Sequence, residues 1–155
     1  MTPSSVDRRA IATLFVFLIA FTGVALAHEG ATGVVKERME MMQQVAKHWK
    51  SIRERIDAKR DLESIKADAE AIAAHAPHIA HLFPKGSTQK PSEARAAIWQ
   101  NWPDFERKAA ALETESKKLA NADPNDFDAL SAEARAVTQA CVACHEKYRS
   151  KRRKE

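Results

Sequence analysis

Four stretches of this 155-residue chain place apolar residues alternately three and four positions apart, the spacing of helices that each bury one face. Short segments rich in turn formers separate the stretches, so consecutive helices must run in opposite directions. We call the predicted buried positions seams: Val35, Met42, Val45, Trp49, Ile52 and Ile56; Leu62, Ile65, Ala69, Ile72, Ala76, Ile79 and Phe83; Phe105, Ala109, Leu112 and Leu119; Phe127, Leu130, Ala134, Val137, Cys141, Cys144 and Tyr148. The sequence therefore predicts an all-α fold, an antiparallel four-helix bundle.

Proline and glycine mark where these helices should begin, bend and end. The longest connection is predicted at residues 83–91, which hold two prolines and a glycine. Pro103 suits the first turn of the third helix, and Asp123-Pro124 is the pattern of an N-cap followed by proline for the fourth. Pro77 lies inside the second apolar pattern, so we expect it to kink that helix rather than end it.

The N-terminus has the pattern of an export signal. Arg8 and Arg9 precede an apolar run over residues 10–20, and Ala25-Leu26-Ala27 fits a small-x-small cleavage site. This predicts a signal peptide at 1–27, cleaved after Ala27, and one domain at 28–155. A membrane anchor is the alternative, but the apolar run is shorter than the ~20 residues that span a bilayer. We therefore expect a periplasmic protein with no membrane span after cleavage.

Both cysteines of the chain lie in Cys141-Val142-Ala143-Cys144-His145, near the end of the last predicted helix. Positions i, i+3 and i+4 share one face of a helix, so the two thiols and the imidazole belong to the same side. Cys-x-x-Cys-His is typical of c-type haem attachment, in which the thiols add to the porphyrin and the histidine ligates the iron. The motif predicts one covalent haem c, held by Cys141 and Cys144 with His145 as axial ligand.

Three other uses of a cysteine pair fit this sequence less well. A thioredoxin-like pair lies at the start of a helix that follows a strand, whereas this pair is near the end of a helical run. A structural zinc site takes four ligands, usually as two pairs, and the chain has no further cysteine. A disulfide between residues this close on one helix is strained.

The first seam carries one charged residue, Arg38, between Val35 and Met42. A buried guanidinium is costly unless an anion meets it, and a haem propionate would do so with two hydrogen bonds. Met42 lies one turn further along the same face, where its thioether is the predicted sixth ligand of the iron; filling the core is the alternative role. Met39 and Met41 point about 60° and about 100° away from Met42 and suit this position less.

At these residues the chain resembles the class II c-type cytochromes, the family of cytochrome c-prime and its low-spin relatives of the cytochrome c-556 type. The resemblance spans the mature chain through residues 35–38, 81–87, 97–99, 102–105 and 141–149, and x-x-Tyr-Arg after the haem motif is its most specific part. It implies a four-helix bundle with haem near the C-terminal helix, a propionate contact for Arg38, and Arg149 near the proximal histidine. It also implies that Met42 is the distal residue, as in the low-spin electron carriers; high-spin members typically have Leu or Phe there.

The resulting functional prediction is a periplasmic monohaem cytochrome that carries single electrons through a low-spin haem ligated by His145 and Met42. The alternative is a protein with five-coordinate iron that binds NO or CO. The sequence holds no Ser/His/Asp set and no glycine-rich phosphate loop, so we expect no enzyme activity.

Charge limits the partners. The formal charge of +4 falls to +3 when residues 1–27 are removed, because two arginines and one aspartate go with them, and this is too small to indicate nucleic-acid binding. Six cations lie close together at the C-terminal end: Lys147, Arg149, Lys151, Arg152, Arg153 and Lys154. They either complete a solvated helix end or dock an acidic redox partner protein.

The oligomeric state stays open at this level. The resemblance implies a possible homodimer through the first two helices. The first helix, however, carries four positive charges outside its seam: Lys47, Lys50, Arg53 and Arg55.

Overall fold

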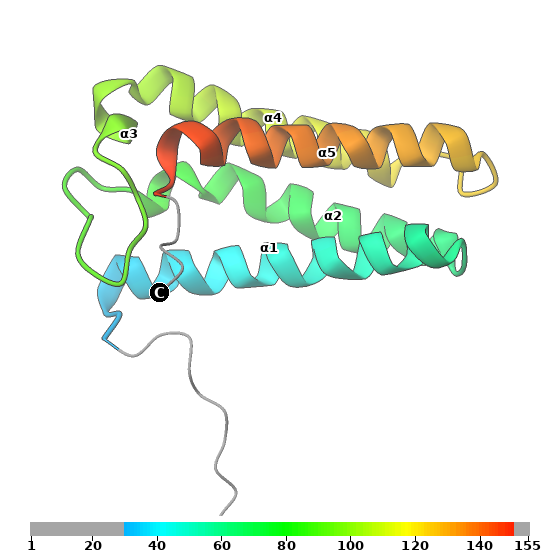
Figure 1. The fold of residues 1–155 in the computed structure, drawn as a ribbon, viewed down its shortest axis with the longest axis horizontal. Helices are drawn as coiled ribbons and strands as arrows, with labels where there is room; N and C mark the ends of the chain where they lie inside the picture. The colour runs from blue at the N-terminus through cyan, green and yellow to red at the C-terminus, as the bar shows by residue number, and fades with distance from the viewer. Residues whose placement is uncertain (1–29, 151–155) are drawn as a thin grey trace, which may run out of the picture.

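A computed structural model describes residues 30–150 of the chain and shows four long helices (Figure 1). They are α1 (Gly33–Ala58), α2 (Ile65–His75), α4 (Trp102–Ala120) and α5 (Phe127–Tyr148), with a short α3 (Ala97–Gln100) before α4. Three 3₁₀ turns (Leu62–Ser64, Ala76–His78, Ala80–Leu82) flank α2. The predicted all-α four-helix bundle is confirmed. The predicted signal peptide, residues 1–27, lies outside the described residues.

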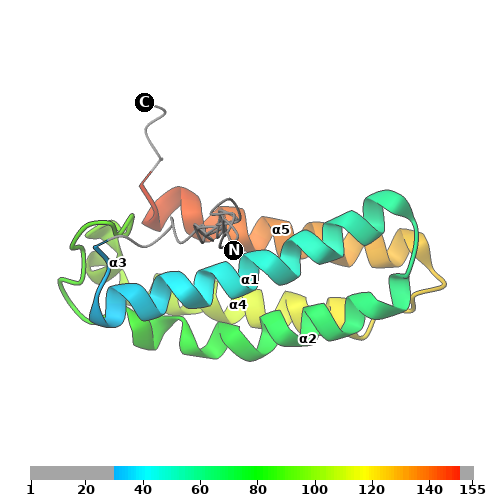
Figure 2. The same ribbon diagram turned by 90° about the horizontal axis from the view of Figure 1, so that it is seen from below.

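The long helices form two antiparallel hairpins, α1 with α2 and α4 with α5 (Figures 1 and 2). The α2 helix also packs along α4, and this contact joins the hairpins. In contrast, α1 and α5 barely approach each other. The bundle therefore has one open side, bounded by its first and last long helices.

The centres of all four predicted seams are buried. Each of five large side chains is at most 2% exposed: Ile52, Ile65, Phe105, Leu119 and Leu130. Burial of one side chain of this size stabilises the fold by about 1.5–3 kcal/mol. No helix in the described part of the chain is both long and apolar enough to cross a membrane.

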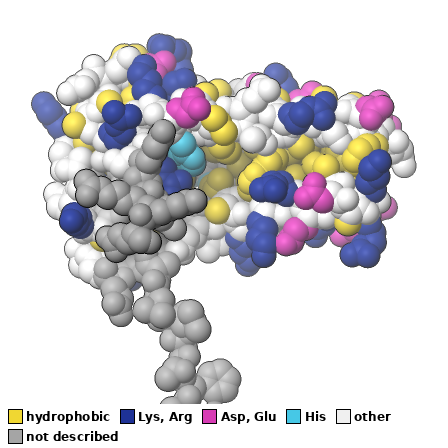
Figure 3. Space-filling model, in the orientation of Figure 1, with side chains coloured by type: hydrophobic (Ala, Val, Ile, Leu, Met, Phe, Trp, Pro, Cys, Tyr) yellow, Lys and Arg dark blue, Asp and Glu magenta, His cyan; other side chains and the backbone are white. Residues whose placement is uncertain are grey.

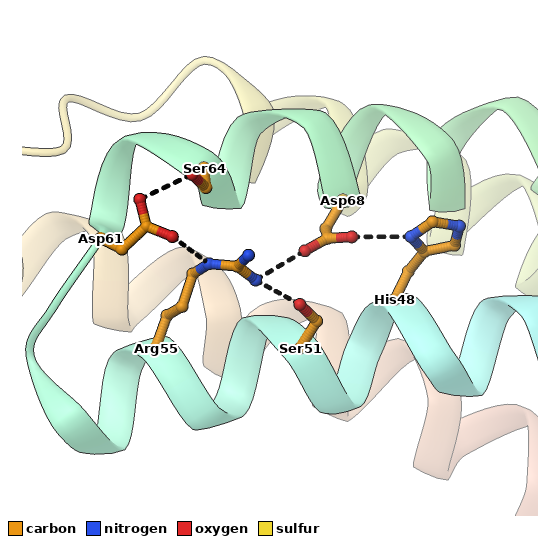
Figure 4. A network of polar contacts seen from close by, with 6 residues as sticks. All are labelled: His48, Ser51, Arg55, Asp61, Ser64 and Asp68. Carbon is orange, nitrogen blue, oxygen red and sulfur yellow. Dashed lines mark hydrogen bonds and ion pairs between the residues drawn. The ribbon is translucent and has the colours of Figure 1, made fainter.

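A polar network joins α1 to α2 near the turn between them (Figure 4). Arg55 donates to Asp61 (Nε–Oδ2 2.9 Å) and to Asp68 (Nη1–Oδ2 2.8 Å), and it also contacts Ser51. The other oxygen of Asp68 lies 2.7 Å from Nδ1 of His48. Arg55 is therefore bound within the hairpin, and it is not the free surface charge that its place outside the seam suggested.

The start of the last helix differs from the prediction. Its N-cap is Asp126, whose side chain accepts a hydrogen bond from the backbone N–H of Ala129 at 3.0 Å. Asp123 instead accepts from the backbone N–H of Asn125 at 2.9 Å. The Asp123-Pro124 pair therefore forms a tight turn, and the helix begins only after the next aspartate.

Pro77 also acts differently from the predicted kink. The α-helical part of α2 ends at His75, and two 3₁₀ turns continue from Ala76 to Leu82. The apolar period nevertheless continues, because Ala76, Ile79 and Phe83 remain buried. A proline lacks the N–H that an α-helix requires, and the tighter turns keep the buried face without it.

Candidate haem site

The Cys-x-x-Cys-His motif occupies the last turns of α5. Cys141 and Cys144 are not joined in a disulfide, and both are half-buried and packed against the core. Val142, which lies between them in sequence, is 46% exposed, because successive residues of a helix point about 100° apart. The observed helix therefore turns both thiols to the inner face of α5, as the spacing predicts.

Burial keeps both cysteines protonated at neutral pH. It raises the pKa of the Cys141 thiol and raises the pKa of Cys144 to about 11. A reactive thiolate of the thioredoxin kind needs the opposite shift. Residues 30–150 also contain no group of three or more His, Cys, Asp or Glu side chains that could hold a metal ion, which disfavours a zinc site.

His145 follows in the same turn and is suited to bind a metal. Burial lowers the pKa of its imidazole, nearby Arg149 lowers it further, and Glu93 opposes both effects. The neutral imidazole is the form that ligates metals. Arg149 is in turn held by Glu93, with Nε 2.6 Å from Oε2. The position of Arg149 near His145 agrees with what the resemblance implies.

Arg38 is only 4% exposed on α1 and is held by the loop that follows the second seam. Its Nη1 donates to the carbonyl oxygen of Leu82 and to Oγ of Ser87, both at 3.2 Å. Its Nη2 donates to the carbonyl oxygen of Ser87 at 2.9 Å and to Oγ of Ser92 at 2.7 Å. The guanidinium also lies over the ring of Phe83, 4.3 Å from its centroid.

These contacts differ from the expectation that Arg38 needs an anion to satisfy its hydrogen bonds. Four of its donors already meet neutral acceptors, which leaves Nε–H as its remaining donor. The charge itself stays uncompensated: Arg38 forms no salt bridge within the described part of the chain, and burial lowers its pKa. The site thus retains a buried positive charge that suits a propionate.

Two methionines of α1 pack against the core. Met41 and Met42 are half-buried and pack against the same cluster as Cys141 and Cys144. Burial alone therefore does not distinguish them. Met42 is displaced about 40° around the helix from the buried Arg38 and Met41 about 60° in the other direction, so the register of α1 favours Met42 by a small margin.

The open side of the bundle fits a large apolar group. Figure 3 shows a hollowed band of hydrophobic side chains between α5 above and α1 below, with charged side chains on both margins. Most half-buried seam residues come from these two helices: Met42, Trp49, Ile56, Phe127, Cys141 and Cys144. Two thiols and a neutral imidazole are the groups that a covalent haem c requires, and a thioether and a buried cation are compatible with it.

Some contacts around the motif have no signal in the sequence pattern. The chain end pairs with the loop before α3: Ser150 N–H donates to the carbonyl oxygen of Glu93 at 2.8 Å, and Arg95 N–H donates to that of Tyr148 at 2.9 Å. The side chain of Tyr148 bonds to Asp104 at the start of α4. Loop residues so far apart in sequence share no periodicity, although the resemblance included Tyr148 and Asp104.

A four-helix bundle whose last helix carries Cys-x-x-Cys-His defines a class II c-type cytochrome. A family model described as Cytochrome C' matches residues 33–149. Cytochrome c-556 of Agrobacterium tumefaciens (strain II Chrys) is 32% identical over 122 residues, 77% of this chain and 99% of that protein. Cytochrome c' of Alcaligenes xylosoxydans xylosoxydans is 31% identical over 121 residues, 76% of this chain and 94% of that protein. The chain belongs to the cytochrome c' family, and its cofactor is haem c.

Solved structures agree with this fold. Cytochrome c' from Thermochromatium tepidum superposes with a TM-score of 0.70 at 24% identity, covering 76% of this chain and 95% of that one. The nitric oxide complex of a cytochrome c prime variant from Alcaligenes xylosoxidans superposes with a TM-score of 0.67 at 29% identity, covering 77% and 94%. The chain is thus a monohaem c-type cytochrome with the bundle of its family.

Proposed function

We propose that this protein is a periplasmic carrier of single electrons, with haem attached through Cys141 and Cys144 and iron ligated by His145 and Met42. The observation that supports this most is Met42 itself, a thioether one turn beyond the buried Arg38 and packed on the same core as both cysteines. When bound, the haem supplies a one-electron couple between ferrous and ferric iron. Thioether ligation opposite an imidazole raises the reduction potential of such iron.

The protein's own residues restrict that chemistry to electron transfer. Met42 belongs to a helix that is fixed to α2 by the Arg55 network, and His145 belongs to the last turn of α5. Ligands on packed helices move little between oxidation states. Arg38 contributes a buried positive charge toward a propionate, held in place by four loop contacts. No residue of the site acts as an acid or base in this role.

A second function, NO or CO binding at five-coordinate iron, has one observation in its favour. A solved relative that is 29% identical holds nitric oxide. In that role Met42 fills the core beside an open iron position. The two functions differ in whether the thioether is bound to iron.

Replacement of Met42 by leucine separates the two functions. We expect the wild-type ferric protein to be low-spin, to show the weak long-wavelength band of methionine–iron ligation, and to resist CO when reduced. Met42→Leu should lose the band and bind CO, while the free energy of unfolding changes by less than about 1.5 kcal/mol because the side chains are similar in volume. Absorption spectra of both oxidation states provide the measurement.

Met41→Leu is the matched control, because Met41 is the adjacent half-buried methionine. It should keep the band and the resistance to CO. A high-spin wild-type spectrum with rapid CO binding would favour the gas-binding function. Loss of the band in Met41→Leu but not in Met42→Leu would assign the ligand to Met41.

The export and partner predictions complete the proposal. We propose that residues 1–27 are removed, so that the mature protein begins at His28, which mass spectrometry of the periplasmic protein would establish.

We also propose that the basic C-terminal end docks an acidic redox partner. Two of its cations have internal partners, since Lys147 is paired with Asp104 and Arg149 with Glu93. Lys151, Arg152, Arg153 and Lys154 lie outside the described residues.

A further inference from the structure

A carboxylate at the start of α4 gathers three donors around it. Oδ2 of Asp104 accepts a hydrogen bond from the hydroxyl of Tyr148 at 2.6 Å and lies 2.8 Å from Nζ of Lys147. Its Oδ1 accepts from Nη2 of Arg107 at 2.9 Å. Tyr148 and Lys147 belong to the last turn of α5, so Asp104 links the start of one helix to the end of another.

The tyrosine in this link is part of the core. Tyr148 is 3% exposed, and its ring meets that of Phe105 edge-on with centroids 5.3 Å apart. Phe105 in turn packs edge-on against Phe83 at 4.9 Å. The aromatic contacts fix the ring, and its hydroxyl then lies 2.6 Å from Oδ2 of Asp104 and 3.3 Å from the backbone carbonyl oxygen of Asn101. A hydrogen bond to a charged group at this place contributes more than an exposed one.

His145 has no comparable anchor of its own. A histidine that ligates metal ordinarily donates its other ring N–H to a protein acceptor, which fixes the orientation of the ring. Neither ring nitrogen of His145 hydrogen-bonds to another residue in the described part of the chain. Only its backbone is tied down, since its carbonyl oxygen accepts from the N–H of Arg149 at 3.0 Å. The ring therefore depends on the turn that carries it.

We propose that Asp104 is a positioning residue for His145: from the first turn of α4 its carboxylate holds Tyr148 and Lys147, and thereby fixes the last turn of α5 and the imidazole on it. This rests on the proposed role of His145 as axial ligand. In this arrangement α4 controls the orientation of His145, an axial ligand that lies on α5. The loop at residues 93–95 holds the same turn from the backbone side.

Hydrogen–deuterium exchange of the full-length holoprotein tests this, with the reduction potential as a second readout. Asp104→Asn keeps the shape of the side chain but removes its charge, and Tyr148→Phe removes only the hydroxyl. Each should make the amides of Arg149 and Ser150 exchange about tenfold faster, the effect of losing one charge-assisted hydrogen bond. Asp104→Asn should also shift the potential upward, because a negative charge that acts on Cys144, which would hold the haem, is lost. Asp104→Glu should restore both readouts toward wild type.

Glu113→Gln is the matched control, since it breaks an ion pair with Lys117 elsewhere on α4. It should leave both readouts at wild-type values. Wild-type exchange at Arg149 and Ser150 in both Asp104→Asn and Tyr148→Phe would overturn the proposal, as would an equal effect of Glu113→Gln. Absence of covalent haem from the unaltered protein would refute the proposed function instead, which is a distinct failure.

Discussion

The contact between α2 and α4 and the side between α1 and α5 are built from the same apolar period but differ in how far their side chains are buried. The closed contact uses branched and aromatic side chains that are almost fully buried, such as Ile65, Ile72 and Leu119. On the open side, the six seam residues of α1 and α5 named above stay half-buried, and three of them carry sulfur: Met42, Cys141 and Cys144. The comparison teaches that close helix packing holds three sides of the bundle together, while the fourth is the side that we propose receives the cofactor.

The largest effect is expected from substitutions on the open side, at the two cysteines. A double variant, Cys141→Ser with Cys144→Ser, removes both thioether links, so we expect complete loss of covalent haem. A haem-stained denaturing gel of protein expressed with a maturation system measures this. Val142→Ser is the control, because it places the same side chain at the exposed position between the cysteines, and its band should stain fully. A stained band in the double variant would contradict the attachment residues.

An intermediate effect is expected on the closed side. Leu119 is 1% exposed, so Leu119→Ala should lower the free energy of unfolding by about 2–5 kcal/mol through lost burial and a residual cavity. The haem spectrum should not change, because Leu119 is near the end of α4 opposite to Asp104. Denaturant unfolding and absorption spectra of the holoprotein measure the two properties. A changed spectrum would show that the two sides are coupled.

The smallest effect is expected from one buried serine of α4. Ser116 is fully buried on α4, and its hydroxyl has no hydrogen-bond partner among residues 30–150. Ser116→Ala removes an unsatisfied polar group, so we expect the protein to become more stable by about 1 kcal/mol. Denaturant unfolding provides the measurement. Thr114→Ala, at an exposed position of the same helix, should change stability by less than about 0.5 kcal/mol. A destabilised Ser116→Ala variant would mean that a bound water satisfies the hydroxyl.

Much of the fold follows from the sequence because its information is local and periodic. Ile52, Phe105 and Leu130 recur at seam positions, and each is buried as its place in the pattern predicts. The helical spacing of Cys141 and Cys144 is confirmed for the same reason, since residues three apart on a helix share a face. The burial of Arg38 follows from its place between two apolar seam residues.

The contacts that the sequence did not predict join segments without a shared period. Arg38 meets Ser87 and Ser92, which lie in a loop 49 and 54 residues away, and no spacing rule connects a loop serine to a helix. The pairing of Asp104 with Tyr148 spans 44 residues. The wrong prediction of Asp123 as N-cap of the last helix has a different cause. An aspartate before a proline is equally suited to a turn, and Asp126, three residues later, is a second candidate for the N-cap.

The unequal packing of α1 has a consequence for the haem-free protein. This helix rests on α2 and the short turn after it, with almost no support from α4 or α5. Elements with few partners open most readily, so α1 should be the first part of the haem-free protein that proteases cut. Haem bound between the first and last helices would then protect α1 from proteolysis, and chains that never received haem would be degraded first.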